Sequence, residues 1–260
     1  MAHRAPPLSR SAEDYLKAIY CIGEPEEAAS TSAIAEALQV QPASVTGMVK
    51  RMAESDLLEH LPYRGVRLTP KGTLAALRVL RRHRILETYL TEELGYAWED
   101  VHDEAERLEH AASDGLIERM AEALGNPRHD PHGAPIPTPT GEIEATAPGT
   151  LWEMRPEEEG RVRAVRDDDS RALQEAEAAG LLPGSDFRVV DADRPDGPMT
   201  IHVEGGASEE IEVRARVARR VFVRLTSPSE PSDASPRPDP FPASPTPEET
   251  DTPRSPGQEE

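Results

Sequence analysis

The chain has one cysteine, Cys21, and only 4% of its 260 residues are aromatic. A lone cysteine cannot form an internal disulfide, as is usual for proteins of a reducing cytoplasm. The first ten residues contain no apolar segment of signal or membrane length, so we expect a cytoplasmic protein with no membrane partner. Neither H-E-x-x-H nor a nucleophile elbow occurs, so two common signatures of hydrolases are missing.

Acidic residues dominate the composition, and the formal net charge of −20 argues against indiscriminate nucleic-acid binding by the whole chain. The balance reverses between residues 43 and 84, where nine basic side chains stand against three acidic ones. Residues 227–260 contain ten prolines and eight acidic residues, so we expect a disordered tail there. The basic segment fits a localised DNA-binding surface, and a solvated charged face is the alternative interpretation.

The N-terminal pattern is typical of a winged helix-turn-helix. Apolar residues at helical spacing predict helices within 11–22 and 31–38, and a turn leads into a third helix at about 43–54. The alternating run 59–69 predicts a hairpin, and Pro70 begins a long helix. Two short helices joined by a tight turn and followed by a hairpin indicate a DNA reader with a wing.

The C-terminal half changes texture. Residues 127–149 are rich in proline, glycine and threonine, which predicts a linker whose His129 and His132 are exposed to solvent. From 150 to 225 short alternating segments are separated by turn signals, which indicates a small barrel.

The segment V-H-D-E-A-E-R-L-E-H places two imidazoles and two carboxylates on one helical face. With His102 at zero, Glu106, Glu109 and His110 fall at about 40°, 340° and 80°. The preceding helix carries another imidazole–carboxylate pair, His83 and Glu87, at i, i+4. Such donors suit manganese, ferrous iron, cobalt or zinc, although a solvated polar stripe is the alternative interpretation.

Several motifs together resemble the metal-dependent repressors typified by the diphtheria toxin repressor and the manganese transport regulator. They are S-x-E-D-Y-L-x-x-I-Y, I-A-E-A-L-x-V-x-P-x-S-V-T-x-M-V, Y-R-G-V-x-L-T-x-K-G, R-H-R-x-x-E and the His/Glu segment above. The resemblance implies an α+β fold with a winged helix-turn-helix DNA-binding domain (1–72), a helical metal-binding and dimerisation domain (73–126), the linker (127–149), an SH3-like β-barrel (150–226) and the tail (227–260).

The resemblance also implies two metal sites. The primary site would use Asp14, Glu106, Glu109 and His110, and the second site His83, Glu87 and His102. Carboxylates at 14 and 106 follow the manganese-responsive members and favour Mn²⁺, with Fe²⁺ second. One position departs from a simple transfer of these sites, and one further ligand could come from another domain. Lys17 stands where the manganese regulator has a glutamate, and the SH3-like domain could lend a ligand from Asp167, Asp168 or Asp169, for which Asp169 is the expectation.

The expected reader helix should present its N-terminal end to base edges and basic side chains to phosphate. The residues expected to contact DNA are Gln41, Ala43, Ser44, Thr46, Gly47, Lys50, Arg51 and Arg64. The alternative is that Ser44 only caps the helix and Thr46 only packs, whereas Val45, Met48, Val49 and Met52 are expected in the core.

The resulting expectation is a homodimeric, metal-activated repressor of metal-transport genes that binds a near-palindromic operator. Candidates for the dimer interface are Leu108, Ala112, Leu116, Ile117 and Met120, some of which could instead be core. Three alternatives stay open: a metallohydrolase, a constitutive DNA binder with a structural metal, and an iron- or zinc-responsive regulator.

Overall fold

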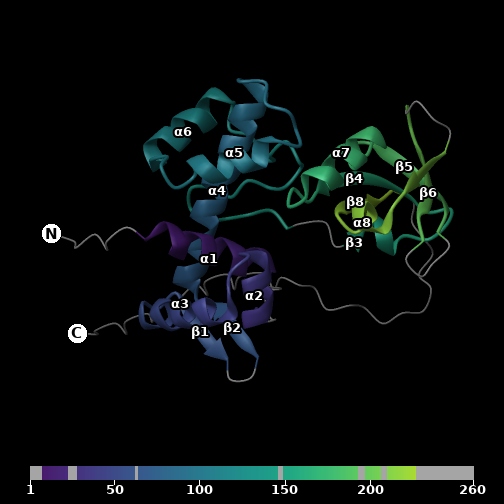
Figure 1. Cartoon of the computed structure of the whole chain (residues 1–260). Coiled ribbons are helices and arrows are strands. Elements are labelled where there is room, and N and C mark those ends of the chain that lie inside the picture. Colours follow the sequence, from purple (N-terminus) through teal and green to yellow (C-terminus); the bar gives the residue numbers. More distant parts are fainter. Residues whose placement is uncertain are drawn as a thin grey trace, which may run out of the picture.

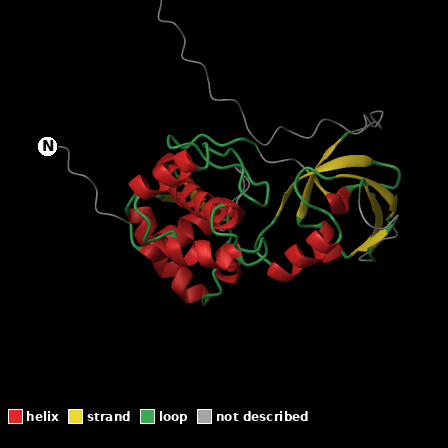
Figure 2. Cartoon of the chain, turned by 90° about the horizontal axis from the view of Figure 1, so that it is seen from above, coloured by secondary structure: helices red, strands yellow, loops and turns green. Residues whose placement is uncertain are grey.

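A computed structural model describes residues 8–22, 28–61, 64–145, 149–192, 197–205 and 210–226. The expected tail, 227–260, lies outside the described residues. The helical part and the strand-rich part form two lobes that lie side by side (Figures 1 and 2). No helix among the described residues is long and apolar enough to cross a membrane.

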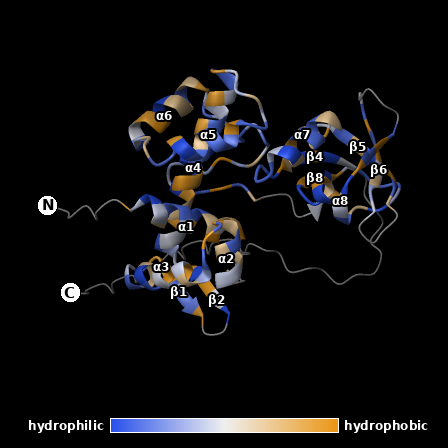
Figure 3. Ribbon diagram, viewed as in Figure 1, coloured by the Kyte–Doolittle hydropathy of each residue, from blue (hydrophilic) through white to orange (hydrophobic). Residues whose placement is uncertain are grey.

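The N-terminal lobe is the expected winged helix. Its helices are α1 (Arg10–Ile22), α2 (Thr31–Ala37) and α3 (Pro42–Glu54), and its wing pairs β1 (Leu58–Leu61) with β2 (Gly65–Leu68) in antiparallel register. Each helix buries one apolar face, and hydrophobic and hydrophilic residues share each helix (Figure 3). The N-cap of α2 is Ser30, whose side chain accepts a hydrogen bond from the Ala33 amide at 3.1 Å. Val45, Val49 and Met52 are buried as expected, and Met48 packs at the edge of this core.

Helix α4 (Pro70–Glu92) connects the winged helix to the rest of the molecule (Figure 1). Pro70 occupies its first turn, and the Thr69 hydroxyl caps it by accepting a hydrogen bond from the Gly72 amide at 3.1 Å. The N-terminal half of α4 packs on α1, and its C-terminal half packs on α5 (Val101–Leu108) and α6 (Asp114–Ala123). Helix α4 therefore links the winged helix to the segment that contains the predicted metal ligands.

Residues 127–138 were expected to belong to a free linker, but they fold back along α4. Ile136 is buried in the same core as α5 and α6. The Arg81 guanidinium donates to the Pro137 carbonyl at 2.9 Å, and Arg84 donates to the Pro135 carbonyl. The carbonyls of Pro135 and Pro137 thus serve as acceptors for one partly buried and one buried arginine. Composition alone had indicated only flexibility.

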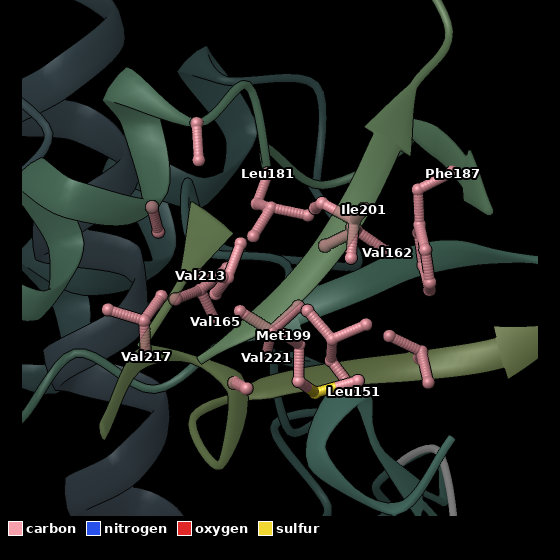
Figure 4. Close-up of a cluster of buried hydrophobic side chains, with 14 of the residues drawn as sticks. Leu151, Val162, Val165, Leu181, Phe187, Met199, Ile201, Val213, Val217 and Val221 are labelled. Atoms are coloured by element: carbon pink, nitrogen blue, oxygen red, sulfur yellow. The ribbon is translucent and has the colours of Figure 1, made fainter. Parts of the chain in front are cut away.

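The C-terminal lobe is a six-stranded antiparallel sheet in the order β3-β8-β4-β5-β6-β7. The strands are β3 (Gly149–Thr150), β4 (Glu159–Val165), β5 (Asp186–Asp191), β6 (Met199–Val203), β7 (Ile211–Val213) and β8 (Val221–Leu225). Alternate apolar residues fill its interior, as Figure 4 shows for residues such as Val162, Phe187 and Ile201. Sequence patterning missed α7 (Ser170–Ala178), which follows β4 and packs on this core.

Candidate metal centre

Four donor side chains from three segments meet between the two lobes. His83 and Glu87 lie one turn apart on α4, His102 lies on α5, and Asp167 follows β4. We call these four residues the interdomain cluster. The side chains of His83 and Glu87 are 3% and 0% exposed, so the apolar packing of α4 has enclosed two polar groups. Buried groups of this kind need partners, and His83 finds them in Glu87 and in the adjoining Glu109.

The distances in the interdomain cluster match the edges of a coordination shell. His83 Nε2 lies 3.0 Å from Glu87 Oε1 and 3.1 Å from His102 Nδ1. His102 Nδ1 lies 3.3 Å from Glu87 Oε1 and 3.2 Å from Asp167 Oδ2. Metal–ligand bonds of about 2.1 Å set at 90–110° place adjacent donors about 3.0–3.4 Å apart. Two facing imidazole nitrogens and two carboxylates at this spacing suit a divalent cation.

Another donor group shares Glu87 with the interdomain cluster and extends it toward the segment that follows α6. Glu87, Asp130 and His132 offer ligand atoms within 4.8 Å of one another. Glu87 Oε2, Asp130 Oδ2 and His132 Nδ1 are buried and have no hydrogen-bond partner, although Arg84 Nε approaches Asp130 Oδ2 at 3.3 Å. Unpaired buried polar atoms are costly, and a cation would satisfy all three. The residues therefore fit a metal.

The sequence analysis was wrong about His132, which is 1% exposed and not solvated. Its Nε2 faces the Trp98 carbonyl at 2.8 Å, and its ring packs against the Trp98 indole. Asp130 fixes this turn, because its Oδ1 accepts the amides of His132 and Ala134, both at 2.9 Å. The spacing D-x-H inside a proline-rich stretch was the signal, and the compositional interpretation masked it. His129, by contrast, is 37% exposed.

A second group joins α1 to the end of α5. Asp14 on α1 faces His110, with Oδ1 2.7 Å from Nε2, and Glu109 Oε1 lies 3.3 Å from the same nitrogen. We call Asp14, Glu109 and His110 the N-terminal cluster. Helix α5 ends at Leu108, but Glu109 keeps helical backbone angles as its C-cap, which preserves the predicted direction of the side chain. Three of the four residues expected at the primary site thus meet.

The fourth expected residue, Glu106, lies outside the N-terminal cluster. Its side chain is 49% exposed and bonds Lys17 Nζ at 3.3 Å. Lys17 also donates to both oxygens of Glu109, at 2.9 and 3.0 Å. The Lys17 ammonium therefore contacts both carboxylates and offsets one of their two negative charges, a contact that the resemblance alone did not indicate.

Glu109 connects the two clusters. Its Oε2 lies 2.7 Å from His83 Nδ1, while Oε1 faces His110. Burial by itself raises the pKa of Glu109, but the hydrogen bond with His83 and the charges of His83 and Lys17 lower it to about 2. The carboxylate is therefore ionised at every physiological pH and holds its neighbours electrostatically.

The histidines of the interdomain cluster are held in the protonated form by the carboxylates around them. Burial lowers the pKa of His83, but the charge of Glu87 and hydrogen bonds to Glu109 and Glu87 raise it to about 9. Burial also lowers the pKa of His102, yet hydrogen bonds to Asp167 and Glu87 raise it to about 11. Protons thus occupy positions that a metal ion would take.

The structure also decides which residue of the acidic run faces the cluster. Asp167 does so, whereas Asp169 caps α7 by accepting the Ala172 amide at 3.0 Å, and Asp168 pairs with Arg220 at 2.9 Å. The expectation of Asp169 was therefore wrong. Sequence analysis lacked α7, and without that helix it could not assign Asp169 to a cap.

The predicted DNA-reading residues are exposed on α3, at its N-cap and in the wing. Those that the structure leaves exposed are Gln41, Ala43, Ser44, Thr46, Gly47, Lys50, Arg51 and Arg64. Gln41, not Ser44, is the N-cap residue, and the Thr46 hydroxyl donates to the Pro42 carbonyl at 3.3 Å. The wing residues Pro62 and Tyr63 lie outside the described residues. An exposed helix N-terminus beside a basic wing suits a major groove and its phosphates.

Comparisons with known proteins agree with this architecture. Residues 7–66 match the family "Iron dependent repressor, N-terminal DNA binding domain", residues 69–138 match "Iron dependent repressor, metal binding and dimerisation domain", and residues 149–225 match the FeoA domain. The second match includes the folded-back segment 127–138. The third covers the whole six-stranded sheet.

Individual relatives cover most or part of the chain. The diphtheria toxin repressor of Corynebacterium diphtheriae is 31% identical over 222 residues, which cover 82% of this chain and 97% of that protein. The iron-dependent repressor IdeR of Mycobacterium leprae is 38% identical over 130 residues, which cover 50% of this chain and 56% of that protein, so this match spans about half of its length.

Solved structures show the same fold. A manganese-dependent transcriptional repressor in complex with manganese superposes with a TM-score of 0.77 at 35% identity, covering 82% of this chain and 99% of that one. ScaR with bound Zn²⁺ gives a TM-score of 0.71 at 31% identity, covering 82% and 98%. The chain belongs to the family of metal-dependent transcriptional repressors that includes the diphtheria toxin repressor, a family of DNA-binding proteins and not of enzymes.

Proposed function

We propose that the protein is a cytoplasmic, homodimeric repressor that binds a near-palindromic operator when a divalent metal is bound and thereby controls genes of metal transport. The observation that supports this function best is the N-terminal cluster. Asp14 belongs to the winged helix, and Glu109 and His110 belong to the helical domain. A cation held by all three fixes one domain against the other, so operator affinity becomes linked to metal binding.

The ligands that we propose follow from the geometry. At the primary site they are Asp14, Glu109 and His110, joined by Glu106 once Lys17 releases it. At the second site they are His83, Glu87, His102 and Asp167, with Asp130 and His132 on the far side of the shared Glu87 carboxylate. When bound, the metal supplies an electrostatic cross-link.

Manganese is the proposed effector, with ferrous iron second. The donors in both clusters are imidazoles and carboxylates, and the one cysteine, Cys21, belongs to neither. Hard oxygen donors without a thiolate favour Mn²⁺ relative to softer ions. The relatives are named for iron and for manganese, so the choice between these two metals rests on the donor set.

The proposed dimer uses the apolar surface of α5 and α6. Leu108 and Leu116 are 37% and 45% exposed, which suits an interface. Ile117 is buried in the domain core, and Ala112 and Met120 pack partly against it, so these three expected interface residues stabilise the fold first. A symmetric dimer would present two α3 helices to two half-sites.

The experiment that tests this function is an operator-binding titration. Promoter DNA from metal-transport genes is titrated with protein in the presence of Mn²⁺, Fe²⁺ or Zn²⁺, against a chelated control. We expect Mn²⁺ to raise affinity about 5- to 150-fold, the usual range of allosteric coupling. Equal binding in chelator would instead assign the metal a structural role and make the protein a constitutive DNA binder.

Lys50→Ala and Thr46→Val should separate phosphate contacts from base contacts. Both side chains are exposed on α3. Thr46 lies near the N-terminal end of the helix, where we expect contacts to bases, and Lys50 lies one turn later, where we expect a contact to phosphate. We expect Lys50→Ala to weaken binding to all sequences and to reduce the salt slope by about one, because one counterion contact is lost. Thr46→Val should act unevenly across operator variants. The same uniform loss from both changes would contradict this placement of the reader helix.

Metal uptake at the interdomain cluster should release protons. His83 and His102 have pKa values of about 9 and 11, above the ordinary 6.5, so both rings are protonated at pH 7. A metal takes only a neutral imidazole nitrogen, so affinity should rise with pH steeply up to about 9 and less steeply from there to about 11. Calorimetry in buffers of different ionisation enthalpy should detect about two protons released per chain. His102→Ala should release one fewer, whereas His60→Ala, in the exposed wing, should leave the count unchanged.

A further inference from the structure

One carboxylate beside the N-terminal cluster has no part in the sites described so far. Glu13 lies on α1 next to Asp14, and its Oε2 lies 2.7 Å from His110 Nδ1. Its other oxygen, Oε1, accepts from Arg82 Nη2 at 2.5 Å. Glu13 is 15% exposed and His110 10% exposed, so the contact is shielded from water. Neither the resemblance nor the helical face had indicated this residue.

The two nitrogens of His110 are thus divided between two carboxylates. Nδ1 faces Glu13, and Nε2 faces Asp14 and Glu109. Glu13 lies on the side of the ring opposite the N-terminal cluster and is not among its ligand groups. A carboxylate that accepts the proton of one imidazole nitrogen fixes the tautomer and the ring orientation and leaves the other nitrogen free to bind metal.

We propose that Glu13 is a positioning residue for metal binding at the N-terminal cluster. It holds the Nδ1–H of His110 and thereby directs the Nε2 lone pair at the cation. This inference rests on the proposed function, because it assigns the metal to His110 Nε2. The ion pair with Arg82 on α4 keeps the Glu13 carboxylate in place. Residues of α1 and α4 therefore determine the direction of the His110 ring, which follows α5.

The structure offers a variant series that separates positioning from simple packing. Glu13→Ala removes the acceptor, and Glu13→Gln restores an acceptor oxygen without charge. Arg82→Met removes the other partner of Glu13 but leaves the contact with His110. Asp114→Asn is the matched surface control, since Asp114 approaches Arg82 Nη1 at 3.6 Å, is 74% exposed and belongs to neither donor group. Circular dichroism and sedimentation establish that each variant is folded.

The first measurement is Mn²⁺ affinity, read from the electron paramagnetic resonance signal of free Mn²⁺, for the class of sites that disappears in Asp14→Asn. We expect Glu13→Ala to weaken this class about 10- to 100-fold, the usual effect of removing such a partner. Glu13→Gln should recover most of the loss, Arg82→Met should cost less than Glu13→Ala, and Asp114→Asn should have no effect. An Mn²⁺ affinity that is unchanged in Glu13→Ala would overturn the proposal.

The second measurement does not depend on affinity. With diamagnetic Zn²⁺ bound, ¹⁵N-histidine spectra of the wild type should contain a protected ring N–H signal that is absent in His110→Ala. Glu13→Ala should lose this signal, and Glu13→Gln should keep it. A persistent signal in Glu13→Ala contradicts the inference alone, whereas absence of Asp14-dependent Mn²⁺ binding in the wild type contradicts the proposed function itself.

Discussion

In Glu109→Gln, Mn²⁺ should no longer raise operator affinity, and binding should equal that of the chelated wild type. Glu109 is the one residue of the N-terminal cluster that also touches the interdomain cluster, through His83. Glutamine keeps the volume but removes the anionic oxygens that face His110, His83 and Lys17. The loss therefore equals the full coupling, about 5- to 150-fold, and not a fraction of it. Fluorescence anisotropy of labelled operator DNA in Mn²⁺ and in chelator measures it.

Glu104→Gln is the matched control for this change. Glu104 lies on α5, five residues before Glu109, and its carboxylate pairs at 2.8 Å with Arg107 on the same helix. An exposed pair of this kind contributes little to stability, so the control should keep the full response to Mn²⁺. Circular dichroism and sedimentation should show both variants folded and dimeric. Retention of the Mn²⁺ response in Glu109→Gln would remove this carboxylate from the proposed metal site.

Gly133→Ala should detach the C-terminal lobe from the helical domain. Gly133 has a φ of +84°, and a Cβ there would lie 2.1 Å from the Arg163 carbonyl of β4. Next to it, the Val165 amide donates to the His132 carbonyl at 2.8 Å, and Asp167 follows two residues later. A methyl group cannot fit against backbone, so β4 must move and take Asp167 away from His102.

We expect this separation to weaken metal binding at the interdomain cluster by about 5- to 150-fold, corresponding to about 1–3 kcal/mol of overpacking. It should also make residues 139–145 about 5- to 150-fold more accessible to protease, if opening follows the same free energy. Gly125→Ala is the control, because Gly125 also has a positive φ, +74°, but open space around it. Equal effects from both changes would attribute the result to backbone strain and not to the domain contact.

Sequence patterning predicted the winged helix well because each of its elements carries its own local signal. The helical period and Pro70 in the first turn of α4 are local features that tertiary packing did not override. The interdomain cluster could not be predicted from local signals alone. Asp167 enters it only because β4 is bound through its Val165 amide to the segment around His132, a contact between residues 33 positions apart. No local pattern encodes that pairing.

The segment 127–138 shows why composition misled. Proline and glycine indicate a chain that does not form regular structure, but they do not indicate whether that chain packs. Here arginines of α4 use the proline carbonyls as acceptors, and Asp130 shapes a tight turn. Sequence reasoning missed Asp130 and Glu13 near the metal centre, and both act through side-chain contacts of this kind.

Lys17 has a consequence for how much metal the cell must supply. Its ammonium is tethered to α1 and contacts the carboxylates of Glu109 and Glu106. A group on a short tether competes at an effective concentration in about the millimolar range, whatever the ionic composition of the surrounding solution. A divalent ion that uses both carboxylates must displace this internal competitor. The chain itself therefore sets a minimum on the metal concentration at which the proposed switch responds.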